Sequence, residues 1–75
     1  MEINDIKKIV SIFLKINPDL INDDTIIDKT AIQGSILFHR MISRINNLYN
    51  TDISDTSDVK TFNDLTNLIK YKIGE

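Results

Sequence analysis

The chain has 75 residues, of which 41% are hydrophobic and 27% are charged, and its formal net charge is -2 at pH 7. This length predicts one domain, residues 1–75, and the composition is that of a folded globular protein rather than a disordered chain. The chain has no cysteine, which excludes a disulfide framework, a thiolate nucleophile and a cysteine-based zinc site.

The distribution of charge and hydropathy excludes further classes. Lys and Arg are dispersed rather than clustered, which argues against nucleic-acid binding. No apolar run approaches the ~18 residues needed to span a bilayer. The first residues, Met-Glu-Ile-Asn-Asp, lack the basic start and apolar block of a secretion signal. We therefore expect a cytoplasmic protein. We also expect the chain to be free-standing and monomeric.

The first predicted element is an amphipathic helix over residues 3–14. Its apolar residues are spaced by three, four and seven, as on one face of a helix with 3.6 residues per turn. They are Ile3, Ile6, Ile9, Val10, Phe13 and Leu14. We expect Pro18 to stop this helix, because the residue before a proline is disfavoured in the helical region.

Residues 17–34 form a long connection in which polar clusters alternate with apolar residues. A structureless segment of this length is unusual in a compact domain, so we expect its apolar residues to pin it onto the helices, with a short turn near Asp28 to Ile32. Those apolar residues are Leu20, Ile21, Ile26, Ile27 and Ile32. A β-hairpin around Thr25-Ile26-Ile27 is the rival interpretation, but no partner strand with clear alternation is evident.

A second amphipathic helix is predicted over residues 35–49. Gly34 ends the preceding loop, and we expect Ser35 to be the N-cap, exposed at the loop–helix junction beside the positive end of the helix. The buried stripe is Phe38, Met41, Ile42, Ile45, Leu48 and Tyr49, and Asn50-Thr51-Asp52 breaks the helix.

The last predicted helix begins after a polar loop, Ser54 to Asp58. We expect Val59 to anchor this loop, either directly or through one short helical turn. Thr61 is the expected cap of this helix, with Asp64 three residues on as in a capping box. Its stripe is Phe62, Leu65, Leu68, Ile69 and Ile73, and Gly74 ends it. The sequence therefore predicts an all-α fold, a small bundle of three to four helices with a long loop between the first two.

Catalysis has little support in this sequence. His39 is the only histidine, and a Ser35–His39 pair would need an acid such as Asp28 to orient the ring. No pocket is predicted, so a partly exposed surface histidine is the preferred interpretation and we expect no enzyme. Asp23, Asp24 and Asp28 lack the alternating ligands, central glycine and closing glutamate of a calcium loop, so we interpret them as solvated carboxylates.

The outer face of the helix over 35–49 has two interpretations. Arg40 and Arg44 lie on the side away from the core stripe, and Ile36 and Leu37 are less completely buried than Ile42. These residues form either a solvated face at the upper edge of the core or a surface that attracts an acidic partner protein.

The order of these elements resembles the acyl carrier and peptidyl carrier protein family along nearly the whole chain. Gly34-Ser35-Ile36 falls where that family has Asp-Ser-Leu at the start of its second helix. The remaining matching segments are Asp24-Thr25-Ile26-Ile27 upstream, then Met41-Ile42, Ile45, Tyr49, Asp52-Ile53 and Thr61-Phe62-Asn63-Asp64-Leu65 downstream.

The resemblance implies a four-helix bundle in which Ser35 bears a covalent 4'-phosphopantetheine from coenzyme A. The arm's thiol would hold acyl or aminoacyl groups as thioesters, as in fatty-acid, lipid or secondary-metabolite biosynthesis. The implied partners are a phosphopantetheinyl transferase and the ligase and synthase enzymes that load and use the carrier. The implied docking residues are Ile36, Leu37, Arg40, Met41 and Arg44.

The sequence departs from the family at two places. Gly34 replaces the aspartate before the serine, and His39, Arg40 and Arg44 stand where fatty-acid carriers are acidic. The basic residues favour a specialised carrier over a housekeeping fatty-acid carrier. Gly34 favours the alternative, an unmodified carrier-like helical module that only binds other proteins.

Overall fold

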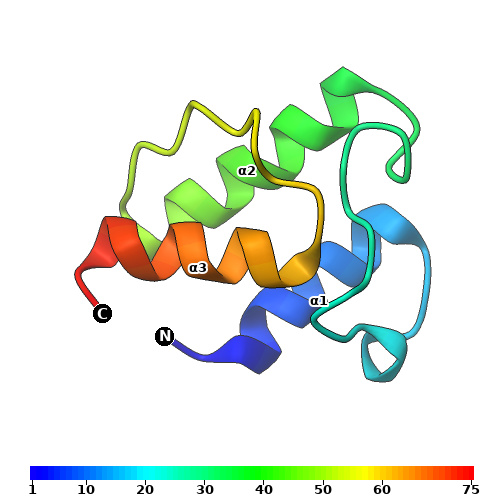
Figure 1. Cartoon of the computed structure of the whole chain (residues 1–75), viewed down its shortest axis with the longest axis horizontal. Coiled ribbons are helices and arrows are strands. Elements are labelled where there is room, and N and C mark those ends of the chain that lie inside the picture. Colours follow the sequence, from blue (N-terminus) through cyan, green and yellow to red (C-terminus); the bar gives the residue numbers. More distant parts are fainter.

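The computed structural model describes all residues from 1 to 75 and contains three α-helices (Figure 1). These are α1 (Ile3–Leu14), α2 (Ser35–Tyr49) and α3 (Phe62–Ile73), with a short 3-10 helix, η1 (Pro18–Leu20), between α1 and α2. The only β-type pairing is an isolated bridge between Ile26 and Thr61. The fold is therefore all-α, the three helix ranges agree with those predicted from periodicity, and no fourth α-helix is present.

The end of α1 differs in cause from the prediction. Lys15, in the left-handed conformation (φ 59°), ends the helix, and its N–H donates to the Ser11 carbonyl. Pro18 lies beyond this point and begins η1 instead, where its fixed φ suits the first helical position.

The long connection between α1 and α2 is held to the start of α3 by backbone hydrogen bonds. Ile27 N–H donates to the Lys60 carbonyl at 2.8 Å, and Phe62 N–H donates to the Thr25 carbonyl at 2.8 Å. The segment is thus held by backbone bonds as well as by three of the five predicted apolar residues, Ile21, Ile27 and Ile32, and no hairpin forms. Ile27 is buried, whereas Leu20 and Ile26 point to solvent with 66% and 52% of their surface exposed.

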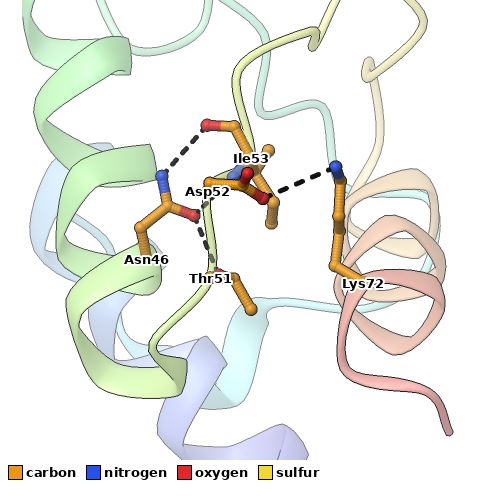
Figure 2. Close-up of polar contacts among 5 residues, drawn as sticks. All are labelled: Asn46, Thr51, Asp52, Ile53 and Lys72. Carbon is orange, nitrogen blue, oxygen red and sulfur yellow. Dashed lines mark hydrogen bonds and ion pairs between the residues drawn. The ribbon is translucent and has the colours of Figure 1, made fainter.

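The connection between α2 and α3 contains no helix, and only a single turn forms where a short helical turn was left open, with Val59 N–H donating to the Thr56 carbonyl at 3.0 Å. Its first residues are held by Asn46 of α2, whose Nδ2 donates to the Ile53 carbonyl at 3.0 Å. Asn46 Oδ1 accepts from Thr51 Oγ1 and from Ile53 N–H, both at 2.9 Å. Figure 2 shows this network, with Asp52 turned the other way toward Lys72 of α3 at 3.7 Å. The side-chain amide of Asn46 thus fixes the start of this loop, where no helix forms.

The capping box predicted for α3 is present. Thr61 Oγ1 accepts from Asp64 N–H at 3.2 Å, and Asp64 Oδ2 accepts from Thr61 N–H at 3.1 Å. Gly74, with φ 82°, ends the helix in the left-handed conformation that glycine adopts without steric cost.

The core combines all three helices with both connections, because three short helices alone leave apolar surface uncovered. Its fifteen buried members are Ile6, Ile9, Val10, Ile21, Ile27, Ile32, Phe38, Met41, Ile42, Ile45, Ile53, Val59, Phe62, Leu65 and Ile69. Leu48, expected in the core stripe of α2, is 51% exposed instead. The two chain ends lie together (Figure 1), with the Met1 amino group 2.7 Å from the Glu75 carboxylate. None of the helices has the length and hydropathy to cross a membrane.

Candidate functional site

Ser35 is the first helical residue of α2, and its side chain is exposed. The N-cap is Gly34, so the prediction that the Ser35 hydroxyl caps the helix is wrong. Gly34 has φ 128° and ψ 160°, a conformation that essentially only glycine adopts. Because the cap position holds no side chain, the first amides of α2 receive no side-chain acceptor, and the Ser35 hydroxyl is not used for capping.

The loop–helix junction is ordered by backbone contacts rather than by Ser35. Gly34 N–H donates to the Lys29 carbonyl at 2.8 Å, and Ile32 N–H donates to the Asp28 carbonyl at 3.1 Å. Asp28 Oδ1 accepts from the N–H groups of Thr30 and Ala31 at 3.0 and 3.1 Å. These bonds form the turn predicted near Asp28 to Ile32, which carries the chain into α2 and leaves Ser35 facing solvent.

The residues around Ser35 divide between surface and core. Ile36 is 71% exposed, Leu37 is half-buried, and Arg40 and Arg44 are exposed, away from the core stripe of α2. Met41 is fully buried, so its predicted place on that surface is wrong. Its position follows from the helical period, since Met41 lies on the same side of α2 as Phe38 and Ile45.

A cleft of about 440 Å³ opens beside the first half of α2, which the sequence did not predict. Its walls are the Asp28 turn, the Phe38-His39 pair and the loop after Ile53. The lining residues are Asp28, Lys29, Thr30, Phe38, His39, Ser54, Asp55, Thr56, Ser57, Val59 and Lys60. Nine of the eleven lining residues are of polar or charged type, and Phe38 and Val59 are the two hydrophobic ones. Because His39 follows Ser35 by four residues, the cleft lies about one helical turn from the hydroxyl.

The carboxylates that line this cleft accept hydrogen bonds from groups of their own loops. Asp55 Oδ1 accepts from Ser57 Oγ at 2.9 Å and from Ser57 N–H at 3.2 Å. The side-chain bond, and then the backbone bond, hold the pKa of Asp55 below its ordinary value. Asp28 likewise bonds to backbone N–H groups of its own turn rather than to His39. The His39 ring makes an edge contact with Phe38, with centroids 6.2 Å apart.

No group of three or more His, Asp or Glu side chains is placed to hold a metal ion. Asp23 and Asp24 are exposed, and Asp24 N–H donates to Asn22 Oδ1 at 2.9 Å.

Comparisons with protein-family models, with curated proteins and with solved structures found no match to this chain.

Proposed function

We propose that this chain is a specialised carrier domain whose Ser35 bears a 4'-phosphopantetheine arm for acyl or aminoacyl thioesters. The observation that carries the proposal is the exposed Ser35 hydroxyl at the first position of α2, free of any capping role. The resemblance in the order and spacing of the elements supplies the chemistry. A carrier needs no catalytic residues of its own, because the modifying and loading enzymes provide them.

The residues around Ser35 fit the group. In the modification, Ser35 Oγ forms a bond to the coenzyme A phosphorus that carries pantetheine. The pyrophosphate bond breaks, adenosine 3',5'-bisphosphate leaves, and the transferase takes the serine proton. A phosphodiester on Ser35 would be at the N-terminus of α2, where uncapped first-turn amides and the helix dipole favour negative charge. Nothing lies within 4 Å of where a Cβ of Gly34 would be, so the approach to the junction is open.

The surface next to Ser35 is suited to partner enzymes. Ile36, Leu37, Arg40 and Arg44 are the predicted docking residues that remain at the surface. The proposed partners are a phosphopantetheinyl transferase and the ligase and synthase that load and use the thioester, acting in the cytoplasm on a monomeric carrier. In this proposal the loop that Asn46 holds stands in for the short third helix of the carrier family.

Intact-mass measurement tests the attachment. The purified chain is incubated with coenzyme A and a broad-specificity phosphopantetheinyl transferase, and the mass is expected to rise by one phosphopantetheine group. Ser35→Ala should abolish the gain, whereas Ser43→Ala, which alters another exposed serine of α2, should retain it. No gain in the wild-type chain, or a gain that survives Ser35→Ala, overturns the proposal.

Gly34 favours one alternative, an unmodified carrier-like module that acts only by binding other proteins. The carboxylate that precedes the serine in the carrier family is missing at this position. Chain recovered from its native host without the arm, yet bound to a partner protein, would decide for the alternative. Recovery with the arm attached would decide for the carrier.

A further inference from the structure

Two parallel rows of side chains run along the exposed part of α2. Ser35, His39, Ser43 and Asn47 form a polar row, and Ile36, Arg40, Arg44 and Leu48 form a second row. All eight side chains are exposed. Residues spaced by four form one of the ridges with which helices pack against neighbouring elements. We call the second row the arginine row. It is a ridge of the kind that packs into a groove of a neighbouring element, but no element of this structure covers it.

The arginine row carries positive charge that the chain does not neutralise. The two ion pairs of the structure join Met1 to Glu75 and Lys72 to Asp52, so Arg40 and Arg44 are both unpaired. No acidic residue occurs anywhere in α2, although the chain as a whole is acidic. The two arginines follow each other by one turn, which corresponds to about 6 Å along the helix axis.

The ends of the arginine row are apolar. Ile36 has 71% of its surface exposed and Leu48 has 51%. Arginine is enriched in protein interfaces, and the contacts that surround such anchor residues exclude water from them. A nucleic acid would satisfy the arginines but would leave both apolar side chains in water.

We propose that the arginine row is the docking surface for a protein partner that presents two carboxylates, about 6 Å apart, between two apolar side chains. One exposed face of an acidic amphipathic helix has this pattern. The guanidinium fork pairs with carboxylates in a two-bond geometry, so two such pairs fix both position and orientation. The row begins at the residue after Ser35, and the inference that the partner acts on a group at Ser35 rests on the proposed function.

A designed helical peptide tests the surface on the unmodified chain. The peptide carries Leu, Glu, Glu and Leu at spacing four, and a matched peptide carries Lys in place of Glu. With isotope-labelled protein, we expect the Glu peptide to shift the amide signals of α2 selectively. R40E/R44E should weaken binding about tenfold or more, because charge-assisted pairs are lost. K8E/K70E changes the net charge equally through exposed lysines of α1 and α3 and should leave binding within about twofold.

A charge exchange makes the test specific, because R40E/R44E should instead gain affinity for the Lys peptide. Unchanged amide spectra of α1 and α3 in both variants show that they are folded. The proposal is overturned if the Glu peptide fails to bind, shifts signals outside α2, or binds R40E/R44E equally well. It is also overturned if a DNA duplex competes better than the Glu peptide, or if sedimentation shows that the row binds a second copy. All these measurements use the chain without the phosphopantetheine arm. Their outcome is therefore independent of the intact-mass test of attachment at Ser35.

Discussion

Substitution of Asn46 most directly tests what fixes the loop between α2 and α3. Its side chain makes three hydrogen bonds, to Thr51 Oγ1 and to both backbone groups of Ile53. Asn46→Ala removes all three at once. The Ile53 side chain is 4% exposed and belongs to the core, so its N–H and carbonyl lose their partners in a partly buried position.

The size of the effect follows from these contacts. A hydrogen bond contributes about 0.5–1.5 kcal/mol net, and a buried group left without a partner costs about 1–3 kcal/mol. We therefore expect Asn46→Ala to lower the free energy of unfolding by about 2–4 kcal/mol. A chain of this length has about 4–11 kcal/mol in total. Since 1 kcal/mol corresponds to about 4–8 °C in a domain of this size, the melting temperature should fall by about 8–32 °C.

Asn47→Ala is the matched control for the Asn46 variant. Asn47 is the next residue of α2, is exposed, and gains the same helix propensity when it is changed to alanine. The difference between the two variants in urea unfolding, followed by circular dichroism, therefore reports the hydrogen-bond network alone. A difference below about 0.5 kcal/mol would show that the network does not hold this loop.

Four further substitutions test three other features by the same unfolding measurement. Gly34→Ala should cost about 1–3 kcal/mol through backbone strain alone, since φ is 128° and the surroundings are open; a cost near zero would contradict this. Met41→Ala should cost about 2–5 kcal/mol because the side chain is fully buried, whereas Leu48→Ala, 51% exposed, should cost clearly less. The pKa of Asp64 is lowered, chiefly by the hydrogen bond from Thr61 N–H and then by that from Lys60 N–H. The ionised carboxylate therefore stabilises the folded chain above the unfolded pKa, and this stabilisation is lost as pH falls through the folded pKa. The stability gap between wild type and Asp64→Asn should thus shrink below about pH 4, and a pH-independent gap would refute the assignment.

The helices were predictable because their signals are local. The spacing of apolar residues marks one face of each helix, and Thr61 with Asp64 marks the start of α3 before any tertiary contact is known. Exposure of Ser35, Arg40 and Arg44 follows from the same periodicity. Each of these features depends on residues within two helical turns of one another.

The features that were not predicted depend on contacts between distant segments. The cleft exists because the backbone of Thr25 and Ile27 bonds to Phe62 and Lys60, which brings the Asp28 turn opposite the loop after Ile53. Periodicity alone also placed Leu48 in the core, since its angular position borders the stripe and only the neighbours decide its burial. The one local signal for the cleft was the run of hydroxyl and carboxyl residues over 54–58, whose facing segment could not be known.

The junction of Gly34 and Ser35 links the conformational and chemical parts of the proposal. An aspartate in the N-cap position ordinarily accepts from the second or third amide of the helix, and it adds a negative charge. Gly34 supplies neither acceptor nor charge, so the first-turn amides of α2 are left without a side-chain partner. A phosphodiester on Ser35 would then find free donors beside it rather than a competing carboxylate. With glycine at this position, α2 has no acidic residue at its start, and Arg40 and Arg44 further along the helix are unpaired. On the proposed function, the glycine at position 34 and the unpaired arginines both make the exposed side of α2 suited to anionic groups.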